Sequence, residues 1–424
     1  MFIQLNLTNI LPGVIITIFE EANFMSLANT PSANRIHIAF FGKRNAGKST
    51  LVNAVTNQEI SVVSDVKGTT TDPVFKSMEL LPLGPVVIID TPGYDDEGEL
   101  GNLRVKKTKQ VLNKTDIAVL VVDALEGITS CEEEIIKLFN EKNINYIIVY
   151  NKSDLLNKLP DKDDKIIYVS AFKKTNIELL KEKLGSLIPE NTDKIKIAGD
   201  FIEKDDVVIL VTPIDEAAPK GRLILPQQQT IRDILDANAV CITVQDTELE
   251  NALKLLNKKP KLVITDSQVF GKVNKIVPQN IALTSFSILI ARIKGLLESA
   301  VKGASKLGTL KENDIVLISE GCTHHRQCND IGTVKLPKMI ENFCGKKINF
   351  EFSSGGEFPE DLSKYSLVIH CGGCMLNDKE MKYRVKCSND QCVPITNYGT
   401  AIAYMNGILE RSLEIIPEIK KILD

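Results

Sequence analysis

The stretch GKRNAGKS at residues 42–49 decides the fold of the first part of this chain. It fits the pattern of a phosphate-binding loop, in which spaced glycines are followed by lysine and serine. An apolar run at 36–41 precedes it and indicates a buried strand, and a helix-compatible run at 49–56 follows it. Backbone N–H groups at the start of such a helix converge on one point, so we expect phosphate to bind there.

Each residue type in this loop has a distinct expected role. Gly42 and Gly47 allow the backbone to turn tightly and to approach the phosphates closely. Lys48 is expected to neutralise the β- and γ-phosphates, and Ser49 to ligate Mg²⁺. The predicted nucleotide-binding residues of this segment also include Asn45, Ala46 and Thr50.

Two motifs later in the chain extend this site. Asp90-Thr91-Pro92-Gly93 follows the apolar run 86–89, where Asp90 can hold the Mg²⁺ shell and the amide of Gly93 can sense the γ-phosphate. Ser170-Ala171 follows the apolar run 166–169, where a backbone amide can meet the guanine O6 atom.

The base is predicted from Asn151-Lys152-Ser153-Asp154, which follows the strand-like run 146–150. A carboxylate at Asp154 can accept hydrogen bonds from the N1–H and 2-amino groups of guanine. Adenine offers no matching pair of donors, so ATP would leave this carboxylate unpaired. Four motifs in this order and at these spacings predict a GTP site.

The set resembles the GTPases of the translation-factor class, and more closely the branch of the tRNA-modification GTPase MnmE and the ribosome-assembly GTPase Era. The resemblance implies that switch I is the segment 68–72, with Thr70 or Thr71 closing on Mg²⁺. It implies catalytic roles for these threonines and for Lys48, Gly93 and Asn45.

The resemblance also implies how water and charge are handled during hydrolysis. Tyr94 follows the DTPG motif, where Ras-like enzymes carry a water-orienting glutamine. The branch instead uses K⁺ that is held partly by a phosphate-loop asparagine, here Asn45. The alternative is that Asn45 is an ordinary loop residue that binds no ion. A water-orienting acid is expected at Glu97 or Glu99.

Composition bounds the remaining possibilities. The 424 residues suggest two or three domains, and 43% hydrophobic with 25% charged residues are typical of a soluble globular protein. The net charge of −4, the absence of tryptophan and the lack of a basic tail disfavour a nucleic-acid partner. We expect residues 1–32 to be an extension and lead-in outside the fold. No stretch qualifies as a transmembrane helix, so the prediction is a cytoplasmic protein without a membrane partner.

The pattern of elements predicts an α/β chain. Residues 33–190 alternate strands and helices as a doubly wound domain requires. Residues 195–300 repeat the alternation without a phosphate loop, and we interpret them as a packing or dimer-forming module. An exposed edge strand at 207–211 is expected to pair with its copy in a twofold homodimer.

The last segment, 305–424, contains two further predicted strands, 315–318 and 367–369, joined through a crossover helix near 337–343. If both strands share one parallel sheet, the residues that follow them meet at its carboxyl edge. An amphipathic helix at 398–413 is expected to cover one face of this sheet.

Cysteine and histidine residues follow both of these strands. Cys322, Cys371 and Cys374 can converge on one metal centre, with His324 and His370 beside them. A structural zinc site, an iron–sulfur cluster and a metal-free redox pair all fit the C-x-x-C spacing, the first two equally well. Cysteines outside this pattern, which we expect to be free thiols, are Cys328, Cys344, Cys387 and Cys392.

This arrangement resembles HydF, the maturation GTPase of FeFe-hydrogenase, in the pattern Cys322-x-His324, a gap, then His370-Cys371-x-x-Cys374. The resemblance implies a three-domain α/β chain, with a P-loop GTPase domain over 33–190, a dimerisation domain over 195–300 and an iron–sulfur domain over 305–424.

It further implies a scaffold that binds a 4Fe–4S cluster through the three cysteines and carries a diiron precursor. The precursor comes from two radical-SAM maturases and goes to apo FeFe-hydrogenase, with GTP acting as a switch on partner exchange. His324 or His370 is then a weak fourth ligand or a hydrogen-bond donor to sulfur, and Asp330 is another candidate ligand. The alternative is an RNA-directed GTPase of ribosome assembly or tRNA modification with a structural zinc site.

Overall fold

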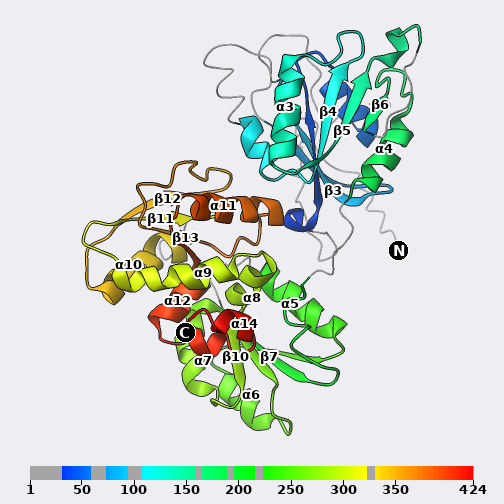
Figure 1. The fold of residues 1–424 in the computed structure, drawn as a ribbon. Coiled ribbons are helices and arrows are strands. Elements are labelled where there is room, and N and C mark those ends of the chain that lie inside the picture. The colour runs from blue at the N-terminus through cyan, green and yellow to red at the C-terminus, as the bar shows by residue number, and fades with distance from the viewer. Residues whose placement is uncertain are drawn as a thin grey trace, which may run out of the picture.

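The computed structural model describes residues 31–58, 73–93, 107–158, 165–188, 195–214, 223–321 and 330–423. These residues form three α/β units, each built around its own sheet (Figure 1). The predicted fold class, a P-loop domain followed by two smaller α/β units, is confirmed.

The first unit is a six-stranded sheet in the order β2-β3-β1-β4-β5-β6 with helices on both faces (Figure 1). Only β2 is antiparallel in it, pairing with β3 at one edge. The apolar runs of the central strands are fully buried, as expected where helices cover both faces. Its strands are β1 (Ile36–Phe41), β2 (Val74–Leu80), β3 (Gly84–Asp90), β4 (Ile117–Asp123), β5 (Asn145–Asn151) and β6 (Ile166–Tyr168). Its helices are α1 (Lys48–Thr56), a helix over 107–112, α3 (Ser130–Glu141) and α4 (Ile177–Ser186), with short 3-10 turns at Ser32–Asn34 and Ser153–Leu155.

The second unit is a four-stranded parallel sheet in the order β10-β9-β7-β8. The expectation of an edge strand at Val207–Val211 is wrong, because β7 pairs with both β8 and β9. All five residues of β7 are buried, which is the pattern of a central strand covered on both faces. The strands are β7 (Val207–Val211), β8 (Val240–Val244), β9 (Leu262–Thr265) and β10 (Ala282–Ser285). The helices are α5 (Leu225–Asp236), α6 (Leu249–Leu255), α7 (Phe270–Ile276) and α8 (Phe286–Ile293), with a 3-10 turn at Ser267–Val269.

The third unit is a parallel sheet in the order β12-β11-β13-β14. The predicted crossover helix exists as α10, but it leads from β11 to the edge strand β12 rather than directly to β13. The strands are β11 (Ile315–Ser319), β12 (Asn349–Ser353), β13 (Leu367–His370) and β14 (Ile395–Asn397). The helices are α9 (Leu297–Ala304), α10 (Leu336–Cys344), α11 (Asp378–Asp390), α12 (Tyr398–Met405), α13 (Leu409–Ser412) and α14 (Pro417–Lys420), with a 3-10 turn at Ser305–Thr309 and a π-helical turn at Ile331–Lys335.

The expected single helix over 398–413 is interrupted. Helix α12 ends at Met405, and Gly407 adopts a left-handed φ of 68°, after which α13 begins at Leu409. A glycine in that conformation ends a helix at little steric cost. The apolar periodicity of the sequence therefore runs on past the point where the helix ends.

The second and third units share one hydrophobic core. Val263 of β9 and Val368 of β13 belong to the same buried cluster. Helix α9 lies so close to β14 that a Cβ atom on Gly303 would meet the carbonyl oxygen of Ile395 at 2.1 Å. Among the described residues, no helix combines the length and the apolar character needed to cross a membrane.

Candidate functional site

The phosphate loop joins β1 to α1 in the conformation that the sequence predicts. Gly42 and Gly47 have φ values of 145° and 85°, which disfavour residues with a side chain. Lys48 folds back over the loop and its Nζ atom donates to the carbonyl oxygens of Gly42 at 2.9 Å and Lys43 at 2.6 Å. Ser49 and Thr50 lie in the first turn of α1, where free N–H groups are available to an anion.

Ser49 and Asp90 come together at the carboxyl edge of the sheet. The Ser49 hydroxyl donates to Asp90 Oδ2 at 2.7 Å. The other carboxylate oxygen, Asp90 Oδ1, is buried and has no hydrogen-bond partner. A buried carboxylate oxygen without a donor is unfavourable unless a cation binds it, so this pair fits Mg²⁺.

Asn151 connects the phosphate loop to the last nucleotide motif. Its Nδ2 atom donates to the carbonyl oxygen of Ala46 at 3.0 Å, and its Oδ1 atom accepts from the N–H of Ala171 at 3.0 Å. A Cβ atom on Gly47 would meet Asn151 Nδ2 at 2.3 Å, so only glycine fits there. Asn151 therefore fixes the phosphate loop and the loop after β6 relative to each other.

The carboxylate expected to read guanine is kept ionised. A hydrogen bond from the Ser170 side chain holds the pKa of Asp154 below its usual range, and Lys173 acts in the same direction from 3.6 Å. Lys152, the second residue of the motif Asn151–Asp154, forms an ion pair with Asp123 at 2.6 Å. This pair fixes the loop after β5. An ionised acceptor is what recognition of two guanine donors requires.

Gly93 and Asn45 also lie at the phosphate loop. A Cβ atom on Gly93 would meet the backbone nitrogen of Arg44 at 3.0 Å, so the DTPG motif packs directly against the loop. Asn45 is exposed and has a left-handed φ of 62°. Several predicted residues lie outside the described part of the chain: Thr70, Thr71, Tyr94, Glu97, Glu99, Cys322 and His324.

The second candidate site is the carboxyl edge of the third sheet. Strands β11 and β13 are neighbours and parallel, with Ser319 opposite His370, so the chain leaves both strands at one edge. Gly321, the last described residue before Cys322, donates its N–H to the sulfur of Cys371 at 3.1 Å. The two segments that the sequence analysis placed together are therefore in contact at this point.

The C-x-x-C loop curls around its own first sulfur. Gly373 has a left-handed φ of 64° and donates its N–H to Cys371 Sγ at 3.4 Å. Such N–H···S bonds strengthen when sulfur carries negative charge, as in a metal thiolate. Burial raises the pKa of the Cys374 thiol, with Lys294 acting against that rise. Both cysteines are free of disulfide bonds.

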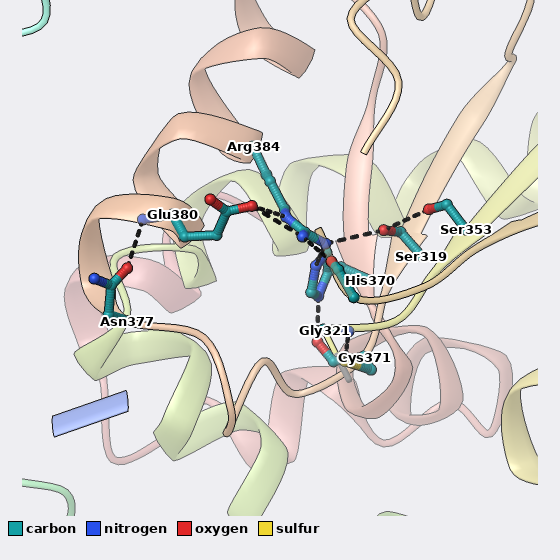
Figure 2. A network of polar contacts seen from close by, with 9 residues as sticks. Ser319, Gly321, Ser353, His370, Cys371, Asn377, Glu380 and Arg384 are labelled. Atoms are coloured by element: carbon teal, nitrogen blue, oxygen red, sulfur yellow. Dashed lines mark hydrogen bonds and ion pairs between the residues drawn. The ribbon is translucent and has the colours of Figure 1, made fainter. Parts of the chain in front are cut away.

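His370 uses both ring nitrogens inside the protein (Figure 2). It is fully buried, with Nδ1 2.7 Å from the carbonyl oxygen of Cys371 and Nε2 3.0 Å from Nη1 of Arg384. Burial, followed by the charge of Arg384, lowers the pKa of His370 to about 3, so the ring is neutral. These contacts favour a supporting role over direct ligation of a metal.

The sequence analysis missed Arg384 and Glu380. Both lie on α11, four residues apart, a spacing that is common for exposed helix pairs and so carries no sign of burial. Asp330 has a structural role in the fold, because its Oδ2 atom accepts from the N–H of Thr333 at 2.8 Å and caps the turn that follows. Within the described ranges, no group of three or more His, Cys, Asp or Glu side chains is arranged to hold a metal ion.

The nucleotide site defines the class: the first unit of the chain is a P-loop GTPase domain. Residues 37–152 match the 50S ribosome-binding GTPase family. The two smaller units match the hydrogen maturase F dimerization domain over residues 197–295 and the hydrogen maturase F tetramerization domain over residues 298–415. The chain belongs to the hydrogen maturase F family, HydF.

Two curated relatives and one solved structure are each similar to part of the chain. GTPase Der of Sulfurimonas denitrificans is 36% identical over 154 residues, which cover 36% of this chain and 31% of that protein. The tRNA modification GTPase MnmE of a Thermoanaerobacter species is 33% identical over 187 residues, covering 42% and 38%. The crystal structure of a probable GTP-binding protein engB is 24% identical with a TM-score of 0.30, covering 36% of this chain and 98% of that one. The chain thus spans about a third of the length of these curated relatives.

Proposed function

We propose that this protein hydrolyses GTP and serves as a scaffold and carrier in the maturation of FeFe-hydrogenase. The observation that carries the proposal is the contact between Gly321 and the sulfur of Cys371. It brings the segment that ends at Gly321 against the loop of Cys371 and Cys374, which supports the proposal that thiols from two separate loops serve one centre. Membership of the hydrogen maturase F family gives the process in which such a centre would act.

Cys322, Cys371 and Cys374 would hold a 4Fe–4S cluster, which supplies an iron able to accept a bridging ligand from a diiron precursor. The chain's own contribution is to present the sulfurs. Backbone N–H groups of Gly321 and Gly373 point at Cys371, and they would stabilise negative charge on it. His324 remains a proposed fourth ligand, whereas His370 is proposed to support the loop.

In the GTPase unit, Lys48 is proposed to neutralise phosphate charge, while Ser49 and Asp90 hold Mg²⁺ together with Thr71. Asn45 is proposed to hold K⁺, which would stabilise charge that develops during hydrolysis. Asp154 would select guanine. We propose the domain limits 33–190, 195–300 and 305–424 for the GTPase, dimerisation and cluster-binding domains.

GTP would regulate partners rather than drive chemistry at the cluster. A cleft of about 750 Å³ separates the GTPase unit from the third unit, and its lining includes Pro73, Lys107 and Glu380. Pro73 and Lys107 are the first described residues after 59–72 and 94–106, and the first of these ranges contains the expected switch I, 68–72. We therefore propose that the nucleotide state changes the shape of this cleft. That change would control when the protein, acting as a homodimer, binds and releases its partners. The partners are the two radical-SAM maturases, which supply the diiron cargo, and apo FeFe-hydrogenase, which receives it.

A transfer assay tests the proposal. Protein expressed with the two maturases is purified, mixed with apo FeFe-hydrogenase, and hydrogen evolution is measured. Protein with all three cysteines replaced by serine should fail, while Cys392→Ser, a matched change at an exposed cysteine, should transfer normally. Equal activation by the triple variant would exclude the cysteine centre from the function. Co-purifying RNA with one bound zinc would instead support the RNA-directed alternative.

A further inference from the structure

A buried arginine, Arg384, is bonded to the residue that precedes the cysteine loop, which we define as residues 371–374. Arg384 of α11 is 0% exposed, and Glu380, one turn earlier on the same helix, is 6% exposed. Burial of a guanidinium group is unfavourable unless its donors are paired, so a position like this demands a network. The carboxylate of Glu380 accepts from Nε at 3.0 Å and from Nη2 at 2.9 Å, which balances the charge.

The remaining donors of Arg384 reach the carboxyl ends of three strands (Figure 2). Nη1 donates to Nε2 of His370 at the end of β13 at 3.0 Å, and to the hydroxyl of Ser319 at the end of β11 at 3.3 Å. Nη2 donates to the carbonyl oxygen of Gly355, just after β12. The Arg384 side chain thus connects the ends of three strands at the sheet edge that also carries Cys371 and Cys374.

These contacts fix the tautomer of His370. Arginine has donors and no acceptor, so Nε2 of His370 must accept from Arg384 and cannot carry a proton. The proton of the neutral ring is then on Nδ1, which donates to the carbonyl oxygen of Cys371 at 2.7 Å. That bond holds the backbone of Cys371, whose sulfur also accepts from Gly321.

We propose that Arg384 is a positioning residue of the cysteine centre, acting through His370 to hold Cys371 in the orientation that metal binding needs. This inference rests on the proposed function. A purely structural arginine would stabilise the fold without determining the state of His370 or the metal affinity. Partners that orient metal ligands indirectly typically change metal affinity by about 10- to 100-fold when removed.

The chain offers a matched control in Arg411. This side chain is also buried, at 8% exposed, and its Nη atoms donate to Asn274 and to backbone carbonyl oxygens near Val277. Its contacts lie in the last turn of α7 and the segment that follows, and they do not include the residues bonded to His370. Arg411→Met should therefore disturb the fold while leaving the tautomer of His370 unchanged.

The first measurement needs no metal. The chain has four histidines, so ¹⁵N-histidine labelling with a His370→Gln variant assigns the ring signals by long-range ¹H–¹⁵N correlation. We expect protonated Nδ1 and unprotonated Nε2 in the wild type and in Arg411→Met. Glu380→Gln combined with Arg384→Met removes both buried charges together, and we expect it to lose the single tautomer. Retention of protonated Nδ1 alone in that double variant would overturn the inference.

The second measurement follows iron release to a chelator after anaerobic reconstitution, with GTP hydrolysis as the check that the GTPase unit is intact. We expect the double variant to release iron about 10- to 100-fold faster than the wild type and Arg411→Met. Arg384→Lys keeps the charge but loses the planar fork, so it should resemble the double variant. Wild-type iron retention in the double variant would overturn the inference. Absence of iron from the wild type would refute the proposed function, while the tautomer measurement would still decide the link between Arg384 and His370.

Discussion

Asn377 links the GTPase unit to the helix that supports the cysteine loop. Its Oδ1 atom accepts from the N–H of Glu380 at 3.0 Å and caps α11, while its Nδ2 atom donates to the carbonyl oxygen of Lys114 at 2.7 Å. The substitution Asn377→Asp separates these roles. An aspartate retains the acceptor that caps the helix, but it has no donor for Lys114.

The cost of this substitution can be worked out from the contact. Asn377 is 5% exposed, so the carbonyl oxygen of Lys114 loses a largely buried donor and faces a carboxylate instead. Leaving a fully buried acceptor unpaired costs about 1–3 kcal/mol, and this range is an upper limit for the half-buried Lys114 carbonyl. That corresponds to a docked population lowered about 5- to 150-fold relative to the separated units, since 1.4 kcal/mol is a tenfold change. Asn377→Ala should cost about 1 kcal/mol more, because it also removes the cap.

Hydrogen exchange measured by mass spectrometry tests this estimate. We expect Asn377→Asp to increase exchange in the segment 107–116 while the start of α11 remains protected. Asn397 provides a matched control, because it caps α12 and its Nδ2 atom bonds to Ser287 within the other two units. Asn397→Asp should leave exchange at 107–116 unchanged. Unchanged exchange there in Asn377→Asp would refute the reasoning that this hydrogen bond holds the two units together.

Three further outcomes are expected. Lys48→Ala should abolish GTP hydrolysis while iron content stays at the wild-type level, because the Lys48 ammonium donates to carbonyl oxygens of the phosphate loop and the proposed cluster ligands lie in the third unit; loss of iron in a colorimetric assay would contradict this. GTP turnover should be faster in K⁺ than in Na⁺ at equal ionic strength, and Asn45→Ala should remove the difference; equal rates in the wild type would argue against the ion. Ser170→Ala should raise the pKa of Asp154 towards its ordinary value, because the Ser170 hydrogen bond is the largest cause of its lowering. Guanine-nucleotide affinity, titrated at decreasing pH, should then be lost at a higher pH than in the wild type, and identical pH profiles would contradict the assignment.

The phosphate loop and its companion motifs were predictable because short-range chemistry determines them. Glycines at 42 and 47 are required by local backbone geometry, and Asp90 and Asp154 each follow an apolar run that forms a strand. Parallel strands deliver such residues to one edge of a sheet, so linear order is enough to place them together.

Other features depend on contacts that linear order does not reveal. The run at 207–211 has the continuous apolar pattern of a central strand, and the expectation of an edge overlooked that both faces are covered. The edge strand β12 has the sequence Asn-Phe-Glu-Phe-Ser, and this alternation of polar and apolar residues is a strand signal that the sequence analysis did not use. Arg384 has the sequence context of an exposed helix residue. Its role follows from hydrogen bonds to residues at the strand ends, which the sequence does not reveal.

The account depends most on a single inorganic centre shared by two loops of the third unit. Metal analysis combined with a visible spectrum of anaerobically reconstituted protein tests it directly. We predict brown protein absorbing near roughly 400 nm with up to about four irons per chain, and loss of both signals when Cys371 is replaced by serine. Colourless protein with one zinc per chain, or iron content that does not change in the Cys371→Ser variant, would contradict the account.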